Sequence, residues 1–294
     1  MGNLDNEFGQ SLMDLLPRSY VVDYTTRAYN AMDAERDGKL NQDDKEWNFG
    51  HGYRNFFVLN EIIRYVDSRE LTTLRVLNLS GMNEGKPDPV LFDLLKDTRS
   101  HLDVKWSIVD HPSSLTFTDL CIGRWVGQRG LECIVHDHRN GPPRVPEAAA
   151  DIVLCTEILE HLDYSIGIAL LRCCQRALRP GGVLIITTPN AVYLGHRVLF
   201  ALGKWDFLHH MDEPKHVDQG VTGHTIYYDG RRLSRLLHNL NFVNVKLVTF
   251  NAGHGPGEFR SIFTRSAAIM LRAASRFVPH SAQVLLASAE RASS

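Results

Sequence analysis

Short aliphatic runs alternate with segments of helical periodicity along most of the chain. The β-branched and aliphatic runs predict strands, at about 74–79, 104–110, 131–136, 150–155, 182–188 and 242–250, with AQVLLAS as a last strand. Segments of helical spacing lie between them, at about 88–97, 113–128, 164–178 and 229–239. Such alternation is typical of a sheet wound by crossover helices.

The helix predicted at 164–178 has the strongest pattern. Ile168, Leu171, Ala177 and Leu178 recur at helical spacing, and Pro180, Gly181 and Gly182 follow directly. Because proline and paired glycines interrupt a helix, we expect them to end it in a tight turn that leads into the next strand.

Three further segments flank or interrupt this pattern. Residues 1–70 are expected to be mostly helical and to form a lid or an extra layer before the domain at 71–294, with an apolar face of Phe56, Phe57, Leu59, Ile62, Ile63 and Val66. Residues 191–225 are long for a connection, so we expect an inserted amphipathic cap that suits a largely apolar acceptor. The stretch 258–277 predicts an amphipathic helix that packs on the domain or forms a dimer contact, with peripheral membrane contact as the alternative.

Composition and charge narrow the class of protein. Hydrophobic residues make up 44% and charged residues 22% of the 294, which excludes a disordered, collagen-like or coiled-coil chain. The formal net charge of -2 gives no general attraction for nucleic acid or an anionic membrane, and no apolar run is long enough to span one. Five cysteines without a C-x-x-C pair indicate a reduced, cytoplasmic chain.

Polar residues gather where the strand at 150–155 ends. Thr156, Glu157, Glu160 and His161 follow that buried strand and precede the helix at 164–178. In open α/β sheets, ligands bind beyond the carboxyl ends of the strands. These side chains therefore fall where a site is expected.

The segment 150–190 resembles the class I S-adenosylmethionine-dependent methyltransferases. In that family a polar residue follows the fourth strand, E-x-x-E-H is common, and L-R-P-G-G-x-L precedes the fifth strand, as it does here at 178–184. The resemblance covers roughly residues 70–290. It implies an α/β fold: a Rossmann-like, doubly wound, seven-stranded sheet with an antiparallel last strand, here with a helical N-terminal layer and the inserted cap. It also implies S-adenosyl-L-methionine as cofactor and methyl transfer to a hydroxyl or amine of a small-molecule acceptor.

The resemblance assigns cofactor binding to polar and small residues after the strands: Asn78, Ser80, Gly81, Asp110, His111, Asp137, His138 and Thr156. Asp110 is expected to accept hydrogen bonds from the ribose hydroxyls, and Asp137 to meet the adenine. The loop after the first strand departs from the family, because Asn78 replaces its usual acid and most of its glycines are missing. This departure leaves open a catalytically silent Rossmann-like binding protein.

The acceptor side is expected at Glu157, His161 and His224. On a helix starting near Glu157, positions 157, 160 and 161 share one face, so their side chains can converge. One interpretation makes His161 or His224 a general base, and another lets Glu160 and His161 only cap or orient the loop. Resemblance to ubiquinone-pathway O-methyltransferases and small-RNA 2′-O-methyltransferases implies instead a divalent-metal site, with RNA as an alternative acceptor. Its ligands would be Glu157, Glu160, His161 and His224.

Residues 33–44, DAERDGKLNQDD, resemble a calcium-binding EF-hand loop. The twelfth position is Asp rather than the usual Glu, and no second loop pairs with it. An acidic, solvated loop is the alternative interpretation.

Overall fold

The computed structural model describes residues 42–79, 87–110, 129–203, 224–251 and 280–293, together with 127, 266, 270, 271, 273–275, 277 and 278. The predicted site residues Ser80, Gly81 and His111 and the side chain of Asp110 lie outside the described residues. So do most residues of four segments: 1–41, 111–128, 204–223 and 258–277. Residues 33–41 of the EF-hand-like loop and most of the predicted helix at 113–128 therefore also lie outside the described residues, whereas residues 42–44 of the loop belong to a helix.

A seven-stranded sheet forms the centre of the molecule, in the order β3-β2-β1-β4-β5-β7-β6. The first five strands run parallel, and β7 pairs antiparallel with both β5 and β6. The strands are β1 (Thr73–Asn78), β2 (Asp103–Asp110), β3 (Glu132–Val135), β4 (Ala150–Thr156), β5 (Leu178–Pro189), β6 (Phe242–Phe250) and β7 (Val284–Arg291). All seven predicted strands are thus confirmed, and so is the antiparallel last strand.

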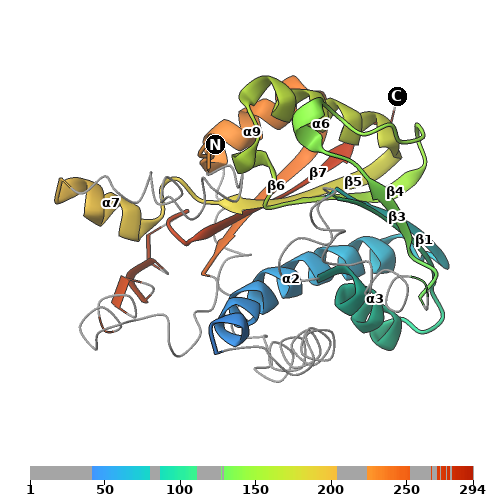
Figure 1. The fold of residues 1–294 in the computed structure, drawn as a ribbon, viewed down its shortest axis with the longest axis horizontal. Coiled ribbons are helices and arrows are strands. Elements are labelled where there is room, and N and C mark those ends of the chain that lie inside the picture. Colours follow the sequence, from blue (N-terminus) through green and yellow to red (C-terminus); the bar gives the residue numbers. More distant parts are fainter. Residues whose placement is uncertain are drawn as a thin grey trace.

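Helices cover both faces of this sheet (Figure 1). The helices α2 (Gln42–Ser68) and α3 (Pro87–Thr98) lie on one face, and α6 (Tyr164–Ala177) and α9 (Gly230–Asn239) lie on the other. Each face has its own buried apolar cluster, as a doubly wound sheet requires. No helix among the described residues is long and apolar enough to cross a membrane.

The long helix α2 is an integral part of the packed core. Val58 and Ile62 are fully buried, and the ring of Phe57 stacks on that of Phe250 in β6 with 4.1 Å between centroids. The apolar face predicted before the first strand therefore packs against the sheet beside α3. Burying it stabilises the fold by about 1.5–3 kcal/mol for each large side chain.

The Pro-Gly-Gly sequence does not form the predicted turn after α6. The helix ends at Ala177, and the backbone from Leu178 onward already belongs to β5, whose pairing with β4 shifts register between Ala150 and Ile152. Gly181 takes up this irregularity with φ +73°. A Cβ at Gly182 would lie 2.9 Å from the carbonyl oxygen of Arg179 in the same strand and 3.0 Å from that of Asp151 in β4, so the backbone leaves no room for a side chain here.

The connection after β5 begins with α7 (Leu194–Ala201), which projects from the body of the molecule (Figure 1). Phe200 is 49% exposed and Leu202 is 68% exposed. The predicted cap at 191–225 stays a prediction, since residues 204–223 lie outside the described part of the chain.

Candidate active site at the carboxyl ends of β1 and β4

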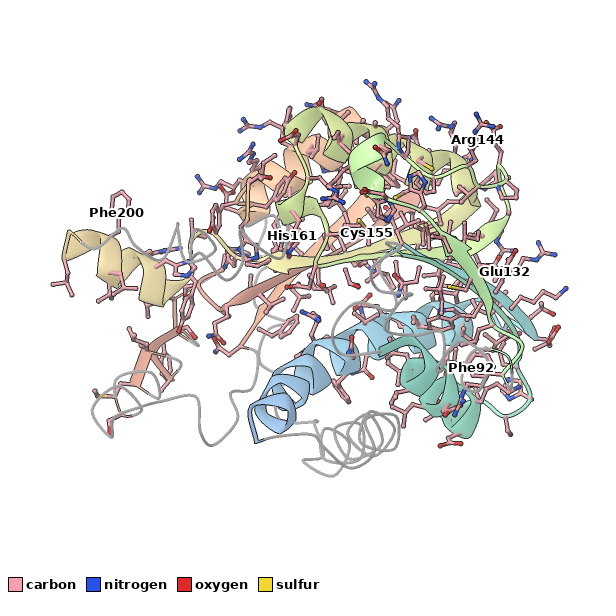
Figure 2. All side chains as sticks on the ribbon, viewed as in Figure 1. Phe92, Glu132, Arg144, Cys155, His161 and Phe200 are labelled. Carbon is pink, nitrogen blue, oxygen red and sulfur yellow. The ribbon has the colours of Figure 1, made fainter. Side chains whose placement is uncertain are left out.

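The connections of the sheet reverse direction between β1 and β4. From β1 the chain winds outward through β2 to β3, and from β4 it winds the other way through β5. Asn78 is buried at the end of β1, and Thr156 closes β4. Ligands of open α/β sheets bind in the crevice at such a switch point. His161 lies toward the same end of the sheet as α7 (Figure 2).

The polar turn after β4 is not the helix that its spacing predicted. Glu157 has φ +50°, and its N–H donates to the carbonyl of Thr187 in β5 at 2.8 Å. A short 3-10 helix, η3 (Leu159–His161), follows, and α6 begins only at Tyr164. The cross-strand hydrogen bond keeps Glu157 out of a helical conformation, so Glu157, Glu160 and His161 do not share one helix face.

Glu160, which lies between the predicted acceptor-side residues Glu157 and His161 in the sequence, is deeply buried, with 1% of its surface exposed. Thr188 Oγ1 donates to its Oε2 at 3.0 Å, and the Glu160 carbonyl accepts from Thr225 N at 2.7 Å. The same side chain and backbone thus fix η3 to β5 and to the segment that carries His224. This structural role agrees with the interpretation that Glu160 orients the loop.

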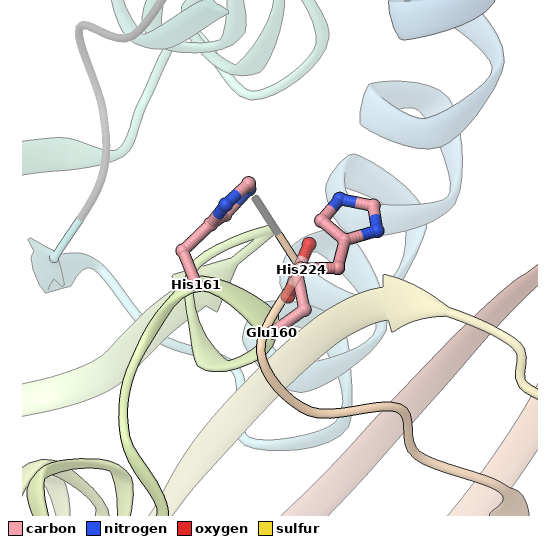
Figure 3. Close-up of side chains that lie close together, drawn as sticks. All are labelled: Glu160, His161 and His224. Atoms are coloured by element: carbon pink, nitrogen blue, oxygen red, sulfur yellow. The ribbon is translucent and has the colours of Figure 1, made fainter. Parts of the chain in front are cut away.

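Glu160, His161 and His224 converge from η3 and from the segment before α9 (Figure 3). One nitrogen or oxygen of each lies within 4.8 Å of one from each of the others. The two imidazole rings meet edge to face, with 4.8 Å between centroids. A carboxylate and two imidazoles at this spacing can relay a proton or ligate a divalent metal ion.

Burial raises the pKa of Glu160 well above its usual value, and the negative charge of Glu157 raises it further. A backbone hydrogen bond at Glu160, the hydrogen bond from Thr188 and the charge of Arg54 oppose this rise in pKa without cancelling it. Ionisation of Glu160 is therefore more costly in the fold than in water.

Arg54 is a site residue that the sequence did not reveal. It lies on α2, and its Nη1 is 3.1 Å from Glu157 Oε2, with both side chains largely buried. The periodicity of α2 marks Arg54 only as a polar position near an apolar face. Because its partner is 103 residues away along the chain, no local pattern could have revealed the ion pair.

The predicted cofactor side lies at the ends of β1, β2 and β3. Asp110 is the last residue of β2 and pairs in register with Val135 of β3. Asp137 caps the short helix η2 (His138–Asn140) and forms an ion pair with Arg139 at 2.9 Å. His138 is buried, and its Nε2 lies 2.7 Å from the carbonyl oxygen of Leu79, so it joins the loop after β3 to the end of β1.

Two solved carbon methyltransferases share this fold at low sequence identity. The DszA carbon methyltransferase is 15% identical over 97% of this chain and 68% of its own, with a TM-score of 0.52. The CurJ carbon methyltransferase is 12% identical over 96% of this chain and 70% of its own, with a TM-score of 0.51. A methyltransferase from Archaeoglobus fulgidus is 17% identical over 80% of this chain and 94% of its own, with a TM-score of 0.47. The class defined by this sheet and its switch point is the Rossmann-like methyltransferase fold.

Residues 79–247 match the family described as "Methyltransferase domain". No curated protein of matching sequence was found. The match begins directly after β1 and ends within β6, so it includes the turn after β4 and the segment that carries His224. The chain belongs to this methyltransferase family, and its cofactor is S-adenosyl-L-methionine.

The chemistry of the residues at this edge of the sheet fits such a cofactor. Asn78 and Thr156 offer polar groups on either side of the switch point, while Asp110 and Asp137 end or follow the two strands beyond β1. Carboxylates in these places suit the hydroxyl and amino groups of a nucleoside. The individual contacts of these residues with the cofactor stay predictions.

Proposed function

We propose that this chain transfers the methyl group of S-adenosyl-L-methionine to a hydroxyl or amine of a small-molecule acceptor that binds over η3. One observation carries the proposal: Glu160, His161 and His224 converge within 4.8 Å of one another beside the switch point. In this proposal Glu157, His161 and His224 face the acceptor. The cofactor is held by the polar and small residues that follow the strands: Asn78, Ser80, Gly81, Asp110, His111, Asp137, His138 and Thr156.

The chain has few chemical tasks, because the bound cofactor supplies an already activated methyl group. Its side chains must hold the acceptor oxygen or nitrogen in line with the bond from sulfur to the methyl group, at ~3 Å from the methyl carbon, and must exclude water. His161 or His224 accepts the proton that the acceptor oxygen or nitrogen loses. Glu160 is buried between η3 and β5 and keeps both imidazoles in place through the backbone bonds described above.

A metal-assisted reaction is the second candidate, and the same cluster favours it. Glu160 Oε1 is buried and has no hydrogen-bond partner in the described structure, so this oxygen is available to ligate a cation. Glu160, His161 and His224 would hold the ion, with Glu157 beside them, and the ion would position acceptor hydroxyls. An RNA acceptor would also need a basic channel, which the net charge of -2 does not supply.

The test is transfer of labelled methyl groups from S-adenosyl-L-methionine to a panel of small hydroxyl and amine compounds. We expect a labelled product with the wild type, and loss of about 10²-fold or more in rate for His224→Ala. The matched control is His238→Ala, an exposed histidine on α9, which should keep the wild-type rate. Equal rates for both variants would refute the assignment of His224.

A chelator separates the two mechanisms. Loss of transfer with EDTA and its return with Mg²⁺ or Mn²⁺ would favour the metal-assisted reaction, and an unchanged rate would favour the metal-free one. Transfer to RNA but to no small compound would contradict the proposed acceptor class. A cytoplasmic location and a homodimer stay predictions.

A further inference from the structure

A hollow of about 400 Å³ lies along α9, beside Tyr164, the first residue of α6. It is lined mainly by polar and charged side chains: Tyr164, Asp229, Arg231, Arg232, Arg235 and Asn239. We propose that the hollow is an anion subsite that binds a phosphoryl group.

The charges around the hollow are not balanced. Asp229 is its one acidic lining residue, and its carboxylate caps α9 by accepting from Arg232 N at 2.9 Å. Three arginines against one aspartate leave a net charge of +2. Arg231 and Arg235 stand one helical turn apart on α9, so their like charges repel each other. Neither arginine forms an ion pair in the described part of the chain. A bound dianion would relieve this repulsion.

Arg232 is held in place before any ligand arrives. Its Nη1 donates to the carbonyl of Tyr227 at 3.0 Å, and its guanidinium carbon lies 5.3 Å from the centre of the Tyr228 ring and 5.6 Å from that of Tyr164. Stacking on aromatic rings fixes the plane of a guanidinium group. Such a fixed plane presents its remaining N–H groups to two phosphate oxygens with little further loss of entropy.

Two helices begin at the hollow. Tyr164 is the first residue of α6 and Gly230 is the first residue of α9, and both helices have at least ten residues. The N-terminal end of a helix carries a partial positive charge that favours anions. Asp229 already caps the start of α9, and the lining residue Asn239 is the last residue of that helix, whose end carries a partial negative charge. The start of α6 is therefore the helix end that reinforces the guanidinium groups.

The hollow lies next to the candidate active site. Tyr164 follows His161 by three residues, so their Cα atoms are at most about 11 Å apart. On the other side, the Tyr227 ring lies 5.7 Å from the His224 ring, and Arg232 is bonded to the Tyr227 carbonyl. An acceptor whose phosphoryl group sits in the hollow can therefore extend toward these histidines. This last step, and only this step, rests on the proposed methyl transfer.

Calorimetric titration of the full chain with pyrophosphate and with inorganic phosphate tests the subsite. We expect saturable binding by the wild type and about tenfold weaker binding, equal to about 1.4 kcal/mol, for the double variant Arg231→Gln, Arg235→Gln. The matched control is Arg172→Gln, an exposed arginine on α6 that does not line the hollow, and it should bind within about twofold of the wild type. Circular dichroism verifies that all three proteins are folded.

Absence of saturable heat with folded wild-type protein at about 10 mM pyrophosphate would overturn the proposal, as would equal binding by the double variant. Binding of a single-stranded RNA through these arginines, without binding of pyrophosphate, would overturn it in favour of a polyanion surface. S-adenosylhomocysteine binding, measured on the same samples, keeps this failure distinct from failure of the proposed function.

A vesicle assay then identifies the source of the phosphoryl group. Retention on vesicles that contain phosphatidic acid, lost in the double variant, would assign the group to a lipid headgroup. Binding of pyrophosphate without such retention would assign it to a soluble phosphorylated molecule.

Discussion

The substitution Glu160→Gln tests the electrostatics of the site directly. Glutamine keeps the size of the side chain and an oxygen that can accept the hydrogen bond from Thr188 Oγ1, which is 3.0 Å in the wild type. It removes the ionisable carboxyl from a position that is 1% exposed. The comparison therefore isolates the cost of ionising Glu160 inside the fold.

The sign of the pH effect follows from the direction of the pKa shift. The pKa of Glu160 is raised in the folded chain, chiefly by burial and then by the charge of Glu157. The native state consequently holds this proton more tightly than the unfolded state, whose glutamate pKa is ~4.3. The resulting stability is fully present below ~4.3 and is lost as the pH rises through the folded pKa, by up to ~1.4 kcal/mol per pH unit for one proton.

Urea unfolding, followed by circular dichroism with EDTA present, measures this loss. Across about pH 5 to 7, we expect the free energy of unfolding of Glu160→Gln to gain on that of the wild type by up to ~1.4 kcal/mol per pH unit. Glu147→Gln is the matched control, because the Glu147 side chain is 77% exposed, and its curve should stay parallel to the wild type. Parallel curves for Glu160→Gln as well would refute the argument that this carboxyl is buried at an ionisation cost.

Three further predictions concern other residues. Arg54→Met should lower the free energy of unfolding by about 1–3 kcal/mol, because it leaves Glu157 largely buried without this cation. Arg172→Met, at an exposed position of α6, should cost less than about 0.5 kcal/mol, and equal losses in urea unfolding would contradict the role of the ion pair. Gly182→Ala should lower the free energy of unfolding by about 1–3 kcal/mol, since its Cβ would collide with the backbone. Gly167→Ala in α6, the control, should instead raise the free energy of unfolding by up to about 1 kcal/mol. A neutral Gly182→Ala in urea unfolding would count against the close approach. His224→Ala should keep its affinity for S-adenosylhomocysteine within about twofold while methyl transfer falls, and a comparable loss of both in calorimetry and transfer assays would assign His224 to folding instead.

Local patterns predicted the centre of the sheet well because β4 and most of β5 are buried on both faces. β4 and the middle of β5 are continuous aliphatic runs, which only a covered parallel strand needs. The polar residues directly after β4 then marked the functional edge of the sheet. Glu160, His161 and His224 were expected there, and the structure brings them together.

Features that depend on contacts between distant segments were not predictable in this way. The bond from Glu157 N to the Thr187 carbonyl replaces the expected helix by η3, and nothing in the local spacing reports it. The Pro-Gly-Gly segment reads as a turn, yet pairing with β4 draws it into β5. Arg54 meets Glu157 only because α2 packs across the sheet.

The central claim is that this chain binds S-adenosyl-L-methionine at the switch point although its first loop departs from the family pattern. Calorimetric titration of the full chain with S-adenosylhomocysteine, and then with S-adenosyl-L-methionine, tests it most directly. We predict saturable binding of both ligands at one site, weakened about tenfold or more by Asp110→Ala, which removes the carboxylate proposed for the ribose. The absence of measurable heat with either ligand, for protein that circular dichroism shows to be folded, would contradict the claim and favour a catalytically silent protein.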